Sequence, residues 1–237
     1  MRRIRLATGP AALFGAMLVV ALLVFLPMRL VLGAAGLGDS GFNARSVTGS
    51  VWDATLSEAR FGDLALGDLD ARLSPLALLL GRARLALDGA PRTLRGAVTV
   101  GRHGFAIDDV TATLPTGRVF NPLPVGTLDL TGLTVHFADG LCTQAEGRVR
   151  ATLVGDAAGV ALPPSVAGNA RCDGGALLLP LASDAGRETV ALRVTGDARY
   201  TAVFALQPTD PATAQHLTAA GFVAGAGGYQ LSVQGHF

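Results

Sequence analysis

Apolar side chains recur at every second position through most of this chain, and that period limits what the chain can fold into. Segment 64–73 shows the pattern clearly. There, Leu69 and Ala71 would face one way and Asp70 the other. Successive side chains of a strand point to opposite faces, so the alternation predicts half-buried antiparallel strands. The chain is therefore constrained to a fold built mainly from strands.

Between the alternating segments lie short stretches rich in glycine, proline and aspartate, which predict turns and loops. We expect about a dozen short strands on this basis. The turns and loops that bear most on the fold are expected at Asp88-Gly89, at residues 101–104, near Gly132 and over residues 115–126.

Two short helices are predicted among the strands. One begins at Ser74-Pro75 and the other at Asp210-Pro211, because a short polar residue followed by proline favours a helix start. Gly81 and Gly221 would end them. So few helices leave little room for the long crossovers that parallel strands need. The sheet is therefore predicted to be twisted and largely antiparallel.

The N-terminal region has a different pattern, because residues 6–28 contain no ionisable side chain. A helix over this run would reach roughly 34 Å, compared with about 30 Å for the hydrocarbon core of a bilayer. Arg2, Arg3 and Arg5 precede the run without any acidic residue, which keeps the N-terminus on the cytoplasmic side. The sequence thus predicts a single-pass signal anchor, with everything after it exported.

Two alternatives to the anchor remain. A cleavable signal peptide needs a small-residue site just after its apolar core, and Gly33-Ala34-Ala35 has that composition, but it lies behind Pro27, Arg29 and a further apolar stretch. A buried core helix is the other alternative. With the anchor preferred, the predicted domains are residues 1–29, a cytoplasmic stub and transmembrane segment, and residues 30–237, a β-rich domain. The predicted fold class is mainly β, with one transmembrane helix before the sheet.

Charge argues against nucleic acid as a partner of the exported part. The chain has no lysine, and four of its 19 basic residues lie in the first 29 positions. The remaining 15 arginines and the 18 acidic residues give the exported part a net charge of −3, and these charges are scattered singly along the expected strands. A nucleic-acid interface would require a clustered basic face.

The chain has two cysteines, Cys142 and Cys172, both in the exported part. In an oxidising compartment a lone pair is most simply a structural disulfide. Buried thiols, or a reactive or metal-linked pair, are the alternatives, but no histidine-rich spacing accompanies them. A bridge closing a loop of about 30 residues would stabilise the fold by roughly 3 to 4 kcal/mol. Each cysteine is expected just ahead of a strand, where the bridge would join two neighbours.

No catalytic constellation stands out. The four histidines are far apart and lie in no nucleophile or metal motif, and three aspartates that could act as paired carboxylates fall at turns or outward strand positions. A glycine-rich stretch lacks the Lys-Ser/Thr of a phosphate loop and reads as a hairpin turn. We therefore predict a protein that is not an enzyme, with no catalytic, cofactor or metal site. The residues weighed are His103, His136, His216, His236, Asp63, Asp68, Asp70 and Gly225-Ala226-Gly227-Gly228.

Several segments, in this order and spacing, resemble the N component of type II secretion systems. They are residues 66–87, Cys142-x₄-Gly147, Cys172-Asp173-Gly174-Gly175, Leu217-x₃-Gly221-Phe222 and Gly228-Tyr229-x-Leu231. The resemblance covers nearly the whole chain. It implies a protein of the cell inner membrane of a Gram-negative bacterium, with a periplasmic β-rich domain, in the machinery that moves folded proteins across the outer membrane. The family has no catalytic residues to carry over.

Two functions follow as hypotheses. The first is a non-catalytic component of the type II protein secretion machinery, acting in the periplasm by contact with other components, through exposed strand edges that accept a partner strand. The second arises because the β-domain is also similar in pattern to AsmA-like groove proteins. It is a lipid-binding or lipid-transfer groove, with membrane lipid as the partner and apolar side chains on the concave face of the sheet.

Overall fold

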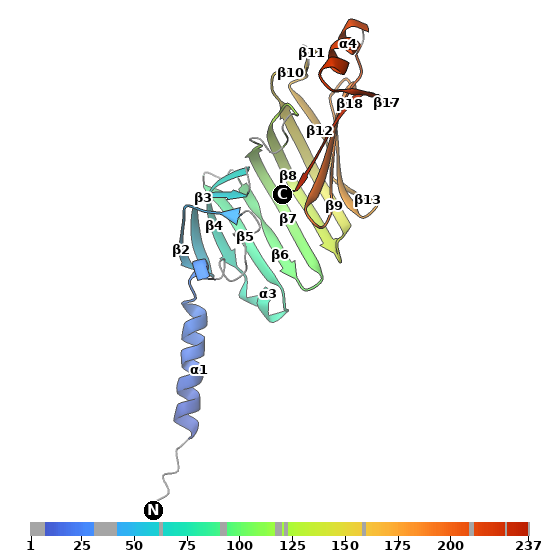
Figure 1. Cartoon of the computed structure of the whole chain (residues 1–237). Helices are drawn as coiled ribbons and strands as arrows, with labels where there is room; N and C mark the ends of the chain where they lie inside the picture. The colour runs from blue at the N-terminus through green and yellow to red at the C-terminus, as the bar shows by residue number, and fades with distance from the viewer. Residues whose placement is uncertain are drawn as a thin grey trace, which may run out of the picture.

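The computed structural model describes residues 8–30, 42–61, 64–90, 94–116, 120, 123–157, 160–208, 211–225 and 227–236. Within them, a helix leads into a long sheet whose C-terminal half curls back on itself (Figure 1). The helices are α1 (Thr8–Val24), α3 (Pro75–Leu79) and α4 (Pro211–Ala219). The first strands are β1 (Phe42–Asn43), β2 (Ser46–Ser50), β3 (Asp53–Phe61), β4 (Leu64–Leu73), β5 (Ala83–Ala90), β6 (Leu94–Gly101), β7 (Gly104–Pro115), β8 (Val125–Ala138) and β9 (Leu141–Leu153). The later strands are β10 (Asp156–Ala157), β11 (Val160–Ala161), β12 (Ser165–Asn169), β13 (Arg171–Asp173), β14 (Ala176–Ala182), β15 (Glu188–Val194), β16 (Arg199–Leu206), β17 (Val223–Gly225) and β18 (Gly228–His236).

The main sheet has 16 strands, and each ladder in it is antiparallel. Its order follows the chain from β3 to β9 and again from β14 to β16, so most strands pair with the one that precedes them. Short turns suffice for such a meander, whereas parallel strands need long crossovers. The prediction of a mainly β, antiparallel sheet with few helices is confirmed.

The two faces of the sheet differ as the alternation predicted. On β4, Leu69 and Ala71 are buried while Arg72 is exposed. Cross-strand pairs keep the faces aligned, because Leu69 lies opposite Leu56 of β3 and Ala71 lies opposite Leu87 of β5. A one-residue shift in register would exchange the two faces, so the burial of one face fixes the pairing.

Apolar side chains form two clusters on the buried face. The first joins β8 and β9 to β14, β15 and β16, and it is closed by Leu217 of α4 and by Phe222, which follows the helix. Phe204 is fully buried there and meets the Phe222 ring edge-on at 6.2 Å between centroids. The second cluster lies under β3, β4 and β7, and includes Met28 from the segment after α1. The curled half of the sheet thus encloses its own core.

Helix α1 is apolar on all sides and projects from one end of the sheet (Figure 1). Leu13, Phe14 and Met17 are exposed along it. Its 17 residues span about 25 Å. In the portion of the chain that the structure describes, no helix has both the length and the apolar character needed to span a membrane. The anchor predicted over residues 6–28, and the domain boundary at 29–30, stay predictions.

Two turn predictions were wrong. The chain does not reverse at Asp88-Gly89, because β5 runs on to Ala90 and Gly89 lies opposite Leu69. Gly132 does not join a hairpin either, since β8 is one continuous strand. Gly132 has a φ of +58° and lies at a register shift between β8 and β9. Both glycines occur inside strands, and a bulge changes the parity of the alternation as a turn would.

Both short helices are present. Helix α3 begins at Pro75 as predicted, although the Ser74 side chain makes no capping hydrogen bond. Helix α4 begins at Pro211 and ends before Gly221, whose φ is +91°. This left-handed conformation is the one that favours glycine after a helix. Asp210, the predicted cap of α4, lies outside the described residues.

Candidate interaction surfaces and the disulfide

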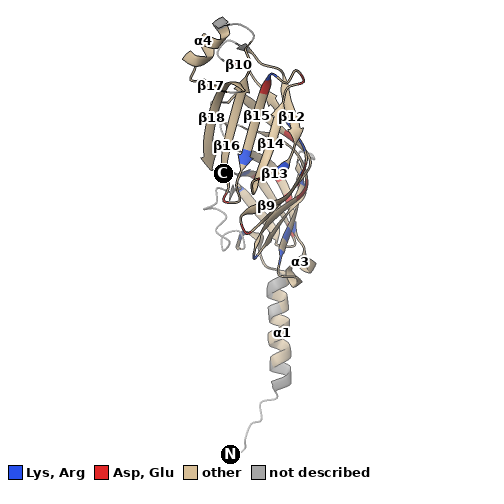
Figure 2. Ribbon diagram, turned by 90° about the vertical axis from the view of Figure 1, so that its right-hand side faces the viewer, with Lys and Arg blue, Asp and Glu red and all other residues tan. Residues whose placement is uncertain are grey.

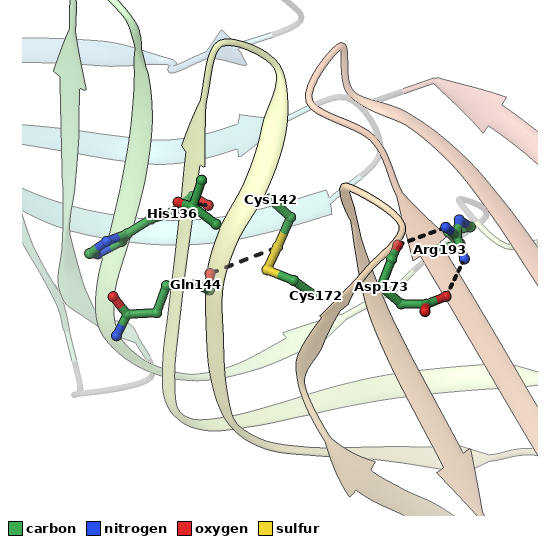
Figure 3. The surroundings of a disulfide bond; sticks show 7 residues. His136, Cys142, Gln144, Cys172, Asp173 and Arg193 are labelled. Carbon is green, nitrogen blue, oxygen red and sulfur yellow. Dashed lines mark hydrogen bonds and ion pairs between the residues drawn. A yellow bond between two sulfur atoms is a disulfide. The ribbon is translucent and has the colours of Figure 1, made fainter.

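Cys142 and Cys172 form a disulfide, with 5.5 Å between their Cα atoms (Figure 3). The cysteines lie within strands β9 and β13, rather than ahead of strands as the sequence suggested. The Cys142 N–H also donates to the carbonyl oxygen of Gly175, at 2.8 Å, in the turn after β13. A covalent bond and a backbone hydrogen bond therefore join the start of β9 to the β13–β14 hairpin.

The bridge lies where the ladder of the sheet changes partners. Strand β12 pairs with β9 over residues 165–169 but meets β14 only at Ala167 opposite Ala182. After Ala170 the chain continues as β13, which pairs with β14. Residues 165–173 thus pair first with β9 and then with β14. The disulfide ties β9 to β13 at the place where no ladder joins those two strands.

Strand β13 is also held from its far side. Arg193 of β15 donates from Nη1 to Asp173 Oδ2 at 2.8 Å and from Nη2 to the Asp173 carbonyl at 2.7 Å (Figure 3). Two hydrogen bonds from one guanidinium fix the orientation as well as the distance. The disulfide and this arginine hold the short strand between them.

The four histidines do not come together. His136 is the best placed for chemistry, because its Nε2 lies 2.9 Å from Asp108 Oδ1. The other oxygen of Asp108 accepts from Arg84 Nη1 at 2.7 Å. His103 lies 3.6 Å from Asp139 with both side chains exposed, and His236 Nε2 lies 2.9 Å from the carbonyl oxygen of Asp197. His216 is an exposed residue near the end of α4.

The contact between His136 and Asp108 was not predicted from the sequence. Asp108 belongs to β7 and comes just before Asp109, whose φ is +48°, at a register shift between β7 and β8. Arg84 comes from β5 and reaches Asp108 across β6. Only the register of four strands brings these side chains together, and single-strand alternation carries no information about it. The arginine neutralises the carboxylate, which is typical of a structural ion pair on a sheet face.

Asp68 and Asp70, two of the three aspartates weighed as paired carboxylates, each accept a hydrogen bond within the sheet. Asp68 Oδ1 accepts from the Glu58 amide at 2.8 Å, where Glu58 has a φ of +49° and the β3–β4 ladder shifts register. Asp70 Oδ1 accepts from the Thr55 hydroxyl at 2.9 Å. Both carboxylates therefore stabilise the sheet locally. Asp63 lies outside the described residues.

One exposed carboxylate has a perturbed pKa. The Thr195 hydroxyl and then the Arg199 guanidinium donate to Asp197, and these hydrogen bonds lower the pKa of Asp197 to about 2. All three residues belong to the β15–β16 turn and its flanks. The shift favours the ionised form of a turn residue and leaves no proton to transfer near neutral pH.

No group of three or more His, Cys, Asp or Glu side chains that could hold a metal ion occurs among the described residues. The glycine-rich stretch is a hairpin between β17 and β18, with Gly225 opposite Gly228. Ala226, within that turn, lies outside the described residues.

The first cluster leaves little room for a ligand. The cavity that Leu179, Leu181, Val190 and their neighbours line has a volume of about 20 Å³. Pockets for small ligands measure about 300 to 1,000 Å³. An acyl chain would therefore have to displace the packed side chains of β14 and β15. The larger hollow, of about 820 Å³, is open and lies on the polar face beside α3.

Strand β18 presents an unpaired edge. It pairs with β16 along Tyr229 to His236, whereas β17 covers its other side only as far as Gln230. Figure 2 shows β18 at the margin of the curled half of the sheet. Beyond Gln230, no strand of the described part of the chain pairs with this side of β18.

The backbone groups on that edge can be assigned by alternation. The Gln207 N–H donates to Arg187 on the β15 side. Leu206 must then bond toward β18, to its partner Tyr229, because antiparallel pairs alternate between bonded and non-bonded. By the same alternation, Ser232 and Gln234 direct their backbone N–H and C=O groups to the open side. These are the groups that a partner strand would use.

Taken with the disulfide, these features define the class of protein. It is an antiparallel β-sheet protein with one disulfide, and an apolar helix precedes the sheet. Its surface presents a strand edge and shallow polar hollows.

The family follows from comparison with known proteins. The family model for the type II secretion system (T2SS), protein N, matches residues 40–232, and the chain belongs to that family. The type II secretion system protein N of Vibrio cholerae serotype O1 is 31% identical over 153 residues. That match covers 60% of this chain and 60% of the relative, so the chain spans 60% of the length of that curated relative. No solved structure matches the chain. The predicted resemblance is confirmed.

Proposed function

We propose that this chain is a non-catalytic, inner-membrane component of the type II secretion machinery that assists export of folded proteins through protein–protein contacts in the periplasm. The observation that carries the proposal is the family match over residues 40–232. The cavity within the first cluster is too small to hold an acyl chain. This favours a role in protein–protein contact rather than in carrying lipid.

The proposed location rests on the N-terminal sequence. Residues 6–28 are uncharged, and the exposed apolar side chains of α1 would be stable in lipid but costly in water. Arg2, Arg3 and Arg5 would remain on the cytoplasmic side. The sheet would then lie in the oxidising periplasm, where the disulfide between Cys142 and Cys172 persists.

The proposed mode of contact is addition of a partner strand to the open edge of β18. Ser232 and Gln234 direct backbone groups to that side, and both side chains are exposed. An added strand would satisfy those groups with main-chain hydrogen bonds, while its alternate side chains provide specificity. The partner would be another inner-membrane or periplasmic component of the machinery.

A proline on the edge tests this mode. Gln234→Pro removes an N–H that faces the open side and leaves the bonds of Leu231 and Val233 to β16 in place, because edge strands tolerate proline there. The matched control, Gln234→Ala, removes the side chain and keeps the N–H. Full-length variants would be cross-linked in cells that run the pathway, extracted in detergent and tested for co-purification with other secretion components.

We expect Gln234→Pro to lose co-purification and Gln234→Ala to keep it. If the folded proline variant is recovered with the same components as the wild type, contact through this edge is wrong. Repeated failure of the wild type to co-purify after cross-linking would count against the secretion role itself. His136→Ala, which breaks the contact with Asp108, should leave secretion intact, and a sharp loss with normal folding would indicate catalysis.

A further inference from the structure

Helix α3 exposes leucines that no other part of the described chain covers. Leu76, Leu79 and Leu80 are 72%, 83% and 78% exposed, and the helix has no buried residue. Each such side chain left in water forgoes the favourable free energy of burial. Three of them gathered on one short helical turn indicate a surface that is covered in the working protein.

Backbone hydrogen bonds place α3 level with the end of α1. The Val51 N–H donates to the carbonyl oxygen of Leu26, at 3.0 Å, just after α1 ends. The Leu73 N–H donates to the carbonyl oxygen of Val51, at 3.2 Å, and Ser74 and Pro75 then begin α3. Figures 1 and 2 both show α3 level with the upper end of α1, at the same end of the sheet.

The segment between α1 and the sheet is packed, so this arrangement is held in place. Met28 is buried in the second cluster, and Pro27 forms a bridge with Ser50 of β2. A membrane crossed by α1 would therefore meet the sheet at the level of α3.

Arginines lie next to the exposed leucines. Arg82 lies shortly after α3, just before β5. Arg102 lies in the β6–β7 turn beside it, since a Cβ on Gly101 would come within 3.9 Å of Arg82 Cγ. Both line the open hollow beside α3 together with Leu79 and Leu80. Within the described part of the chain, neither Arg82 nor Arg102 forms an ion pair.

The acidic groups near this hollow are already engaged. Asp108 is held by Arg84 and His136, and Asp139 lies 3.6 Å from His103. Arg82 and Arg102 are therefore available to an anion from outside the protein.

We propose that α3 is a second membrane contact, in which Leu76, Leu79 and Leu80 enter the boundary between headgroups and acyl chains while Arg82 and Arg102 bind anionic lipid headgroups. The proposal rests on the membrane anchor of the proposed function. Segments that lie in the membrane interface combine an apolar surface with flanking cationic side chains. Their apolar surface is buried about 5 to 10 Å into the boundary between headgroups and acyl chains. Together, α1 and α3 would fix the tilt of the sheet relative to the membrane.

The test uses the full chain in lipid nanodiscs of phosphatidylethanolamine and phosphatidylglycerol, with no other protein present. Both native cysteines are in the disulfide, so Leu79→Cys supplies a unique free thiol for an environment-sensitive fluorophore. The quencher is a lipid with a nitroxide on its acyl chain. Leu18→Cys in α1 reports the anchor, and Val223→Cys is an exposed control on β17, at the opposite end of the sheet (Figure 1).

We expect blue-shifted, strongly quenched emission at positions 79 and 18, and neither effect at position 223. Quenching at 18 without quenching at 79 would overturn the second contact and leave the anchor standing. Absence of quenching at both would overturn the two together. If a blue shift at position 79 appears only after another secretion component is added, and the nitroxide lipid does not quench it, α3 contacts a protein partner and the proposal is refuted.

The arginines have a separate readout. Replacing phosphatidylglycerol with phosphatidylcholine should reduce quenching at position 79, and the Arg82→Gln/Arg102→Gln double variant should abolish that dependence on lipid charge while quenching at position 18 is unchanged. Equal quenching in both lipids for the unsubstituted arginines would refute their assignment to anionic lipid headgroups.

Discussion

Loss of the disulfide should destabilise the whole sheet by a predictable amount. The bridge joins residues 30 apart in the sequence. The loop-closure entropy for that length gives about 3.6 kcal/mol at 25 °C. Cys142→Ala, Cys172→Ala and the double variant should each lower the free energy of unfolding by about this value, because removing either sulfur breaks the same bond.

Urea unfolding of the full chain in mild detergent measures the effect. Far-UV circular dichroism follows the sheet, and the fluorescence of Trp52, the one tryptophan of the chain, follows the second cluster. That cluster is formed by the N-terminal strands, away from the bridge. If the sheet unfolds as one cooperative unit, both probes should report the same transition and the same loss.

Reduced wild-type protein is the matched control, since it lacks the bond and keeps both side chains. If reduction and the double variant each change the free energy of unfolding by less than about 1 kcal/mol, the bridge does not stabilise the sheet by loop closure. A much larger loss for Cys142→Ala than for Cys172→Ala would show instead that core packing of the buried Cys142 side chain dominates.

Three further predictions concern single positions. Phe204→Ala should lower the free energy of unfolding by about 3 to 5 kcal/mol and Phe204→Leu by less, measured by urea unfolding, because the ring is fully buried. Gly168→Ala should lower the melting temperature, because its Cβ would lie 1.9 Å from the Pro180 carbonyl oxygen, and an unchanged value would contradict the close approach of β12 to β14. A carboxyl NMR titration should give Asp197 a pKa near 2, below the ordinary 3.8, so its stabilisation is complete above about pH 4 and lost as the pH falls through 2. Thr195→Val should raise that pKa, and an ordinary value in the wild type would contradict the hydrogen bonds.

Sequence alternation identified single strands well, for a local reason. Residues 64–73 were predicted as a strand with Leu69 and Ala71 on one face, and β4 has those bounds and buries that face. Pro75 and Gly221 marked one helix start and one helix end because their backbone preferences act within a residue or two. The disulfide could be predicted from the expected oxidising compartment and from the presence of two cysteines, since two thiols have a single intramolecular pairing.

Bulges were the first feature that the sequence left ambiguous. Gly132 was interpreted as a turn because apolar positions change parity there, but a bulge inside a continuous strand changes parity in the same way. Which of the two forms depends on whether the neighbouring strands β7 and β9 continue past that point. They do, and each supplies a partner for β8 on both sides of Gly132.

By itself, then, the sequence determined the alternation that favours strands with one buried face, the presence of the two short helices, the family, and the identity of the cysteine pair. The tertiary structure alone decided the exchange of partners at β12 and β13, the meeting of Asp108 with Arg84 and His136, the open edge of β18 and the position of α3 at the level of the end of α1. The physical reason is the separation along the chain over which each effect acts. Alternation and capping act between residues close in sequence, whereas register, curling and unpaired edges depend on which distant strands bury each other's apolar faces.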